Sequence, residues 1–168
     1  MQHDGWLNPD IADWFAEYAA VCFKHFGDRV RHWITLNEPW CAAVLGYGLG
    51  VHAPGRISAD EPYIAGHNLM RAHAKAVQIY RDTYQSQQQG QIALSNNCDW
   101  REPLSEHPAD KEATQRSLEF FLGWFADPVY FGDYPDVMRE MLGDRLPYFT
   151  SEEQAQLKGT ADFFGLNH

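Results

Sequence analysis

The chain has 168 residues, of which 45% are hydrophobic and 21% charged, a balance that is typical of a folded domain and argues against disorder. Its net charge of −10 repels negative surfaces, so neither nucleic acid nor an anionic membrane is expected as a partner. No stretch approaches the roughly 18 consecutive apolar residues that a membrane-spanning helix needs, and no signal peptide is visible.

The three cysteines, Cys22, Cys41 and Cys98, are widely spaced and include no CxxC pair. We interpret them as free thiols of a reducing compartment, which predicts a cytoplasmic location and argues against a disulfide framework or a zinc site. The eight histidines are scattered, so no metal site is predicted, and no cofactor is expected.

The first part of the chain predicts a helix, a strand and a loop. Apolar residues recur every three or four positions over residues 8–26, as in a helix buried on one face, and Gly27 is placed to end it. The apolar run over 30–36 predicts a buried strand that ends at Asn37-Glu38-Pro39, because proline cannot donate to a sheet. The glycine-rich residues 41–59 are expected to form a long loop.

The rest of the chain repeats the alternation of helix and strand. We expect four further helices and two further strands in this part of the chain. Two of these helices begin with residues at capping-box spacing, Ser58–Glu61 and Thr150–Glu153. The expected ranges are a helix from Ser58 that the glutamine run 87–89 and Gly90 close, a strand over 91–97, helices over 111–125 and about 135–143, a helix after Thr150, and a strand over 162–167.

The predicted order is α-β-α-β-α-β, with short apolar strands. Such strands, alternating with helices, indicate an α/β fold with a parallel sheet. A sheet of three strands leaves both edges open, which favours a part of a (β/α)8 TIM barrel over a finished domain.

Polar side chains stand at all three expected strand ends, Asn37-Glu38, Asn96-Asn97 and Asn167-His168. In a (β/α)8 barrel, catalytic residues lie at the carboxyl ends of the strands, so Glu38 is the leading catalytic candidate. The alternative is a carboxylate that merely caps a helix or a turn at the strand exit.

The octapeptide Trp33-Ile34-Thr35-Leu36-Asn37-Glu38-Pro39-Trp40 resembles the signature at the end of the fourth strand in family 1 glycoside hydrolases, the β-glucosidase family. An Asn-Glu-Pro alone would be weak, since other barrel glycosidases share it, but further matches follow in the family's order across the whole chain. They include Gly5-Trp6-Leu7-Asn8, His52-Ala53-Pro54-Gly55, Trp124-Phe125-Ala126-Asp127-Pro128 and Asp162-Phe163-Phe164-Gly165-Leu166-Asn167.

The resemblance implies that residues 1–168 are a fragment of a single glycosidase barrel domain, from about strand 4 to strand 6. It implies hydrolysis of β-glucosides or related β-glycosides with retention of configuration, with Glu38 as the general acid/base, which must be held protonated near neutral pH. Asn37 matches the residue that binds the sugar 2-hydroxyl, and Asn167 matches a polar residue near the nucleophile. Trp40 and His52 match positions that line the leaving-group side of the cleft, and Asn96 lies near the same side.

Structural roles stay open for several of these residues. Trp40 could be a core anchor, His52 could pin its own loop, and Asn96 or Asn97 could form a turn. His67 and His73 are expected to pack or cap rather than to bind a ligand, and Trp124 with Asp127-Pro128 is expected to be structural.

A retaining glycosidase needs a second carboxylate about 5–5.5 Å from the first, which acts as the nucleophile. The family's glutamate in a Glu-Asn-Gly context does not occur in this sequence. We therefore expect the 168-residue chain alone to be inactive, with a β-glycoside or oligosaccharide as the substrate of the parent enzyme, and with the missing barrel segments as a partner in trans. The alternatives are another barrel glycosidase with an Asn-Glu-Pro motif, such as a cellulase, or a non-catalytic carbohydrate-binding module.

Overall fold

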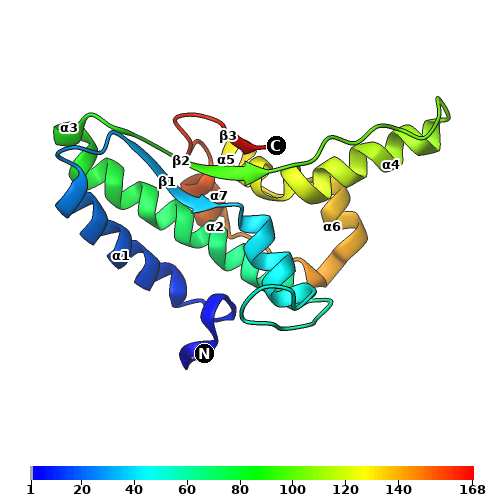
Figure 1. Ribbon diagram of the computed structural model, residues 1–168, viewed down its shortest axis with the longest axis horizontal. Helices are drawn as coiled ribbons and strands as arrows, with labels where there is room; N and C mark the ends of the chain where they lie inside the picture. The colour runs from blue at the N-terminus through cyan, green and yellow to red at the C-terminus, as the bar shows by residue number, and fades with distance from the viewer. Residues whose placement is uncertain (1) are drawn as a thin grey trace.

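The computed structural model describes residues 2–168, apart from the side chain of Gln2. Three parallel strands, β1 (His32–Asn37), β2 (Gln91–Asn97) and β3 (Gly165–Asn167), form a sheet in the order β1-β2-β3. The long helices α1 (Ile11–Phe26) and α2 (Glu61–Ile79) run along one side of this sheet (Figure 1). The predicted parallel sheet is therefore confirmed.

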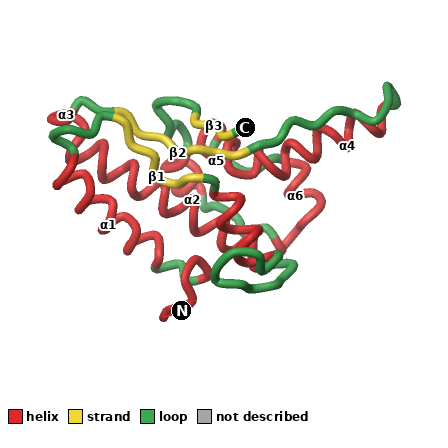
Figure 2. Tube along the Cα trace, viewed as in Figure 1, coloured by secondary structure: helices red, strands yellow, loops and turns green. Residues whose placement is uncertain are grey.

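The connections between the strands are mainly helical, with irregular segments over 49–60 and 98–107 (Figure 2). Helix α2 continues through a π-helical turn, Tyr80–Tyr84, into α3 (Gln85–Gln88) before β2. The connection from β2 to β3 holds α4 (Pro108–Leu118), a π-helical turn (Glu119–Gly123), α5 (Trp124–Phe131), α6 (Asp136–Leu142) and α7 (Ser151–Leu157).

The segment after β1 is not the predicted loop. Cys41–Gly48 is π-helical, and only the residues from 49 to 60 are irregular. Gly46 and Gly48 allow close packing here rather than turns: a Cβ on Gly46 would lie 2.8 Å from the Ala53 carbonyl oxygen, and one on Gly48 would lie 2.9 Å from Pro62 Cγ. Glycine content was therefore a misleading signal for a loop at this position.

Several predicted boundaries move, each for a local reason. Helix α1 begins at Ile11 and not at Asn8, because the Asn8 side chain accepts from the Asp10 N–H at 2.9 Å in a turn that precedes the helix. The helix expected over 111–125 runs on to Phe131, where Gly132, with φ of 98°, ends it. The last strand holds only residues 165–167. Asp162 still contacts β2, since it donates its N–H to the Ile92 carbonyl oxygen at 2.9 Å and accepts from the Ile92 N–H with its side chain at 2.8 Å, but residues 163 and 164 separate it from the strand.

The two predicted capping boxes have different outcomes. At α7, the Thr150 hydroxyl accepts from the Glu153 N–H at 3.2 Å, and the Glu153 carboxylate accepts from the Thr150 N–H at 2.9 Å. At α2, Ser58 Oγ accepts from the Glu61 N–H at 3.2 Å, but the Glu61 carboxylate is paired with Arg56 instead. The first box is confirmed and the second is only half formed.

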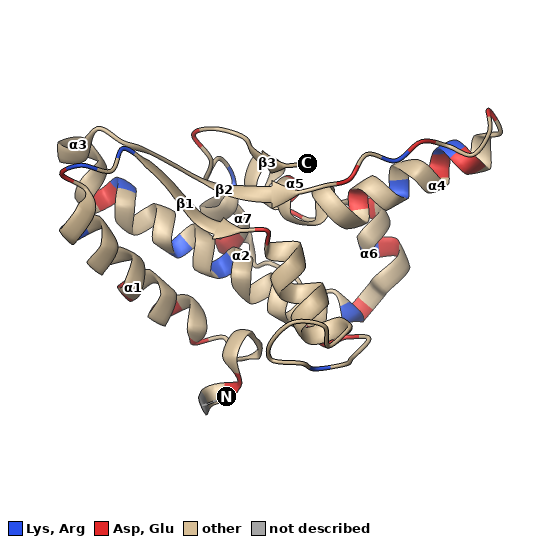
Figure 3. Cartoon of the chain, viewed as in Figure 1, with Lys and Arg blue, Asp and Glu red and all other residues tan. Residues whose placement is uncertain are grey.

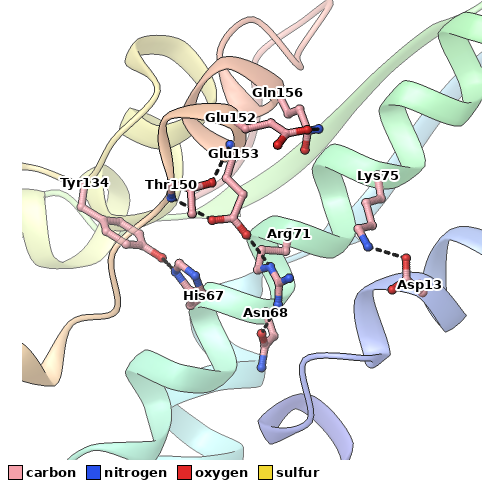
Figure 4. A network of polar contacts seen from close by, with 10 residues as sticks. All are labelled: Asp13, His67, Asn68, Arg71, Lys75, Tyr134, Thr150, Glu152, Glu153 and Gln156. Atoms are coloured by element: carbon pink, nitrogen blue, oxygen red, sulfur yellow. Dashed lines mark hydrogen bonds and ion pairs between the residues drawn. The ribbon is translucent and has the colours of Figure 1, made fainter.

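Helix α2 is the centre of the hydrophobic core, since Leu69, Met70, Ala74 and Val77 on it are almost completely buried. Polar contacts attach the same helix to its neighbours (Figure 4). Arg71 Nε donates to Glu153 Oε1 of α7 at 2.8 Å, and Lys75 pairs with Asp13 of α1.

The two histidines of α2 are structural, as predicted. His67 stacks on Phe149 and lies 3.1 Å from the Tyr134 hydroxyl, and its burial lowers its pKa to about 4. His73 lies 2.7 Å from Thr35 Oγ1 of β1 and 3.1 Å from Thr160 Oγ1, and its burial lowers its pKa to about 3. Both rings are therefore neutral at pH 7 and join the helix to the rest of the structure.

We expect Leu69→Ala to lower the free energy of unfolding by about 2–5 kcal/mol, because it removes a side chain that is 2% exposed from the core around α2. The matched control is Leu104→Ala, where the same atoms are removed from a side chain that is 94% exposed and the loss should stay below about 0.5 kcal/mol. Denaturant unfolding of both variants measures the difference. Equal losses would contradict this placement of the core.

Candidate active site

A bulge in β1 turns Asn37 toward the side of the sheet that α1 and α2 leave uncovered. Ile34 pairs with Ala93 and Asn37 with Ser95, so three steps along β1 match two along β2. Such an extra residue reverses the face on which the following side chains stand. Asn37 therefore shares a face with Ile34, which is 53% exposed, and not with Trp33, which packs against Phe23 of α1.

Glu38 follows the last residue of β1 in an unusual backbone conformation. Its φ is +52°, and its N–H still donates to the Ser95 carbonyl oxygen at 2.8 Å, while its own carbonyl accepts from Ala42 N at 3.3 Å. A left-handed conformation costs a non-glycine residue on the order of 1–3 kcal/mol, and such residues cluster at functional sites. The strand end and the helix after it thus hold Glu38 in place between them.

The side chain of Asn167 joins the ends of all three strands. Its Nδ2 donates to Glu38 Oε1 at 2.7 Å and to Asn37 Oδ1 at 3.0 Å, and its Oδ1 accepts from Ser95 Oγ at 3.2 Å. The parallel register that pairs Asn97 with Asn167 brings this amide to residues about 130 positions earlier in the chain. The three predicted residues Asn37, Glu38 and Asn167 therefore lie together.

Two members of this cluster were missed by the sequence analysis. Cys41 lies three residues beyond Glu38 and contributes to the lowered pKa of its carboxyl group. Asn97 Nδ2 of β2 donates to Cys41 Sγ at 3.4 Å. The spacing of three between Glu38 and Cys41 could have suggested this effect, but only if residues 41–48 had been expected to be helical.

The surroundings of Glu38 favour its ionised form. Its pKa is lowered, first by the hydrogen bond from Asn167 and then by Cys41, and partial burial opposes them only weakly. The sequence analysis expected a carboxyl held protonated near neutral pH, which requires desolvation or a neighbouring carboxylate. In residues 2–168, neither condition is met at Glu38.

The remaining candidates lie apart from this cluster. Trp40 is half-buried and stacks on Phe121, with the ring centroids 4.3 Å apart, so it anchors the first turn after β1 to the turn that precedes α5. His52 is exposed on the loop over 49–60, at the far end of the π-helical segment from β1 (Figure 1).

Asn96 is 5% exposed, and the alternation of side chains along β2 places it on the same face as Ile92 and Leu94. Those two residues belong to the core clusters beneath the helices. Asn97, on the opposite face, is therefore the β2 residue that joins Ser95 in the Glu38 cluster.

Charge is sparse around this cluster. None of the three strands carries a charged residue, and Glu38 directly follows one of them (Figure 3). Asp99 is paired with Arg101 at 3.5 Å, and Asp127 lies in α5, where burial and then Glu119 raise its pKa to about 6. Across the described residues, no second carboxylate is bonded to the Glu38 cluster, and no group of three or more His, Cys, Asp or Glu side chains could hold a metal ion.

Within the part of the chain that the structure covers, no helix has the length and apolar character needed to cross a membrane.

Comparisons with known proteins agree on one family. The model of the family described as glycosyl hydrolase family 1 matches residues 1–168. Beta-glucosidase 42 of Arabidopsis thaliana is 54% identical over 98% of this chain and 34% of its own length, and beta-glucosidase 1B of Phanerodontia chrysosporium is 51% identical over 97% and 32%. The chain thus spans about a third of the length of these relatives.

Solved structures give the same result. The crystal structure of the rice Os3BGlu6 beta-glucosidase superposes with a TM-score of 0.98 at 49% identity, over 99% of this chain and 37% of that one. A glutamate-to-glutamine mutant of the same rice enzyme, solved in a covalent complex with glucose, superposes with a TM-score of 0.97. The three parallel strands are therefore part of a (β/α)8 barrel, and this fold is not that of a β-sandwich binding module.

We expect Asn167→Ala to raise the pKa of Glu38, because the variant removes the strongest donor to the ionised carboxylate. Carbon-detected NMR titration of the Glu38 carboxyl group measures the change. The control is Asn96→Ala, which alters an amide on the other face of the neighbouring strand and should leave this titration unchanged. A Glu38 pKa that is the same with and without the Asn167 amide would show that the hydrogen bond does not persist in solution.

Proposed function

Because the chain belongs to glycosyl hydrolase family 1, we propose that the whole protein hydrolyses β-glucosides or related β-glycosides with retention of configuration. Residues 1–168 form one part of a single barrel domain in this proposal. The observation that carries it is the meeting of Asn37, Glu38 and Asn167 at the carboxyl ends of three parallel strands, where barrel enzymes place their catalytic groups.

Glu38 acts as the general acid/base. In the first step its carboxyl protonates the departing glycosidic oxygen, while a carboxylate elsewhere in the barrel attacks the sugar and forms a covalent glycosyl-enzyme. In the second step the Glu38 carboxylate takes a proton from the attacking water. The covalent glucose complex of the rice relative, obtained with a glutamate-to-glutamine mutant, supports such an intermediate in this family.

The lowered pKa of Glu38 is consistent with this role once the rest of the barrel is considered. A second carboxylate about 5–5.5 Å away would repel the Glu38 charge, and the remaining barrel strands would exclude water from it. Both changes raise the pKa of a carboxyl group, and each comes from outside residues 1–168. The assembled barrel therefore keeps Glu38 protonated for the first step, whereas residues 1–168 set the position of the Glu38 side chain.

The predicted site residues around Glu38 are proposed to have different roles toward the substrate. Asn37 binds the sugar 2-hydroxyl, since it is exposed beside Glu38. Asn167 orients both residues, and the exposed part of Trp40 forms a wall on the leaving-group side. His52 and Asn96 are proposed to lie near the leaving-group side of the cleft as well. Among the hydrogen bonds of residues 2–168 neither reaches the Glu38 cluster, whereas Asn97 bonds to Cys41.

The proposed partners are a β-glycoside and the remaining barrel segments, either on the same polypeptide or supplied in trans. We also propose a cytoplasmic location, which the free thiols of Cys22, Cys41 and Cys98 support. The net charge of −10 continues to disfavour nucleic acid as a ligand.

The 168-residue chain alone should not hydrolyse a chromogenic β-glucoside, since acid assistance without a nucleophile leaves the glycosyl cation unstabilised. The full-length protein should hydrolyse it, and so should the chain after the missing segments are added in trans. Absorbance assays of the three samples test the proposal. Turnover by the isolated chain would refute the claim that residues 1–168 lack the nucleophile. An inactive full-length protein would refute the enzyme assignment.

In the full-length protein, Glu38→Gln should lower kcat/KM by about 10²–10⁴-fold for a β-glucoside with a poor leaving group, because the proton donor is lost. The loss should be much smaller for a dinitrophenyl β-glucoside, whose leaving group needs no proton. Steady-state kinetics on both substrates measures the contrast. Asp99→Asn serves as the control, since this exposed carboxylate pairs with Arg101 and should affect neither rate. Equal losses on the two substrates would contradict the role of Glu38 as acid.

A further inference from the structure

Ser95 of β2 is linked to Glu38 twice, once directly and once through Asn167. The Ser95 carbonyl oxygen accepts from the Glu38 N–H at 2.8 Å. The Ser95 hydroxyl donates to Asn167 Oδ1 at 3.2 Å, and Asn167 Nδ2 donates to Glu38 Oε1 at 2.7 Å. The backbone of Ser95 therefore holds the backbone of Glu38, and its side chain holds the amide that binds the Glu38 carboxylate.

The two ends of the Asn167 amide need partners of opposite kinds. Nδ2 is a donor, and it is bound to two acceptors, Glu38 Oε1 and Asn37 Oδ1, at 2.7 and 3.0 Å. Oδ1 is an acceptor, and the Ser95 hydroxyl donates to it. The torsion that turns an asparagine amide is broad, so the plane of the amide is set by these hydrogen bonds rather than by the side chain itself. Without the Ser95 hydroxyl, the bonds to Glu38 and Asn37 would hold only the Nδ2 end.

Ser95 is a rigid support for this amide because it belongs to the central strand. It pairs with Asn37 on one side and with Gly165 on the other, and it is 4% exposed. Asn167, in contrast, is exposed and ends the three-residue strand β3. Glycine at 165 lets β3 lie close to β2, since a Cβ there would lie 2.6 Å from the Leu94 carbonyl oxygen and 3.2 Å from Ser95 Cβ. The Ser95 hydroxyl thus ties an edge residue to the strand that is paired on both sides.

We propose that Ser95 is a positioning residue for the acid/base Glu38: its hydroxyl fixes the plane of the Asn167 amide, which in turn fixes the direction of the Glu38 carboxyl group. This inference rests on the proposed function of Glu38. The Ser95 hydroxyl is bonded to Asn167 and the carboxylate is bonded to the other end of the same amide, so the effect of Ser95 passes through Asn167.

A misdirected Glu38 carboxyl group costs most where the departing oxygen needs a proton. The departure of an alkoxide requires the proton of Glu38, whereas a dinitrophenolate leaves without it. A loss that affects both substrates equally, from poorer packing or from a disturbed Asn37, cancels in the ratio of their kcat/KM values. This ratio therefore reports the acid assistance that Glu38 gives.

The test is the ratio of kcat/KM for a dinitrophenyl β-glucoside to that for an alkyl β-glucoside, in the full-length protein. Ser95→Ala should raise this ratio by about threefold to tenfold, which is the effect of one neutral hydrogen bond on an equilibrium constant. Ser95→Thr, which keeps the hydroxyl, should retain the wild-type ratio. Ser86→Ala should retain it too, since it alters an exposed serine of α3 at the opposite end of the sheet (Figure 1).

A double-mutant cycle tests whether the Ser95 hydroxyl acts through the amide. In the Asn167→Ala background, Ser95→Ala should leave the ratio unchanged, because the amide that the hydroxyl orients is already absent. The same steady-state assays on the two glucosides measure all four corners of the cycle. Two effects that simply multiply would show that the residues act independently.

The outcomes separate the two proposals. The role of Ser95 would be overturned by an unchanged ratio in Ser95→Ala, by the same rise in Ser95→Thr, or by a rise that persists in the Asn167→Ala background. Equal losses on both substrates would also overturn it, since they would show a loss of packing. In each case hydrolysis by the wild-type protein leaves the proposed function standing. A wild-type protein that hydrolyses neither glucoside would instead overturn the proposed function.

Discussion

The parallel register of three short strands is the constraint on which the candidate site depends. Asn37 pairs with Ser95 and Asn97 with Asn167, so the carboxyl ends of all three strands meet at one edge. A slip of one residue along β3 would send the Asn167 side chain to the opposite face of the sheet and remove its hydrogen bonds to Glu38, Asn37 and Ser95. The contacts of Glu38 are thus a direct result of the backbone pairing.

The helical side of the sheet stabilises that register. Helix α2 packs beneath the strands, and His73 on it lies within hydrogen-bond distance of Thr35 of β1 and of Thr160 shortly before β3. Such a buried polar link has one good geometry, because each unsatisfied group would cost on the order of 1–3 kcal/mol. The opposite side of the sheet has no such cover, and Ile34 is exposed there. A complete barrel would bury it.

The chemistry is divided between this part of the barrel and the rest. Within residues 1–168, the Asn167 amide positions the Glu38 carboxylate, and both this amide and Cys41 favour its ionised form. A glycosidase also needs that carboxyl to hold a proton, which requires a second carboxylate and the exclusion of water. The position of Glu38 is therefore set within residues 1–168, whereas an increase in its proton affinity has to come from other segments of the proposed enzyme.

The sequence by itself determined the alternation of helices and strands, the three strand ends and the identity of Asn37, Glu38 and Asn167. These follow from local patterns: apolar periodicity, the proline after Glu38 and an ordered set of short motifs. Local patterns failed at Cys41–Gly48, where glycines that permit close packing resembled the glycines of a loop.

Only the tertiary structure decided which polar groups meet. The bulge in β1, the left-handed backbone of Glu38 and the contact of Asn97 with Cys41 all depend on the pairing of β1 with β2. The contact between Cys41 and Asn97 joins residues 56 positions apart, which no local spacing can encode. The physical reason is that hydrogen bonds between distant residues are fixed by strand register and helix packing, which involve the chain as a whole.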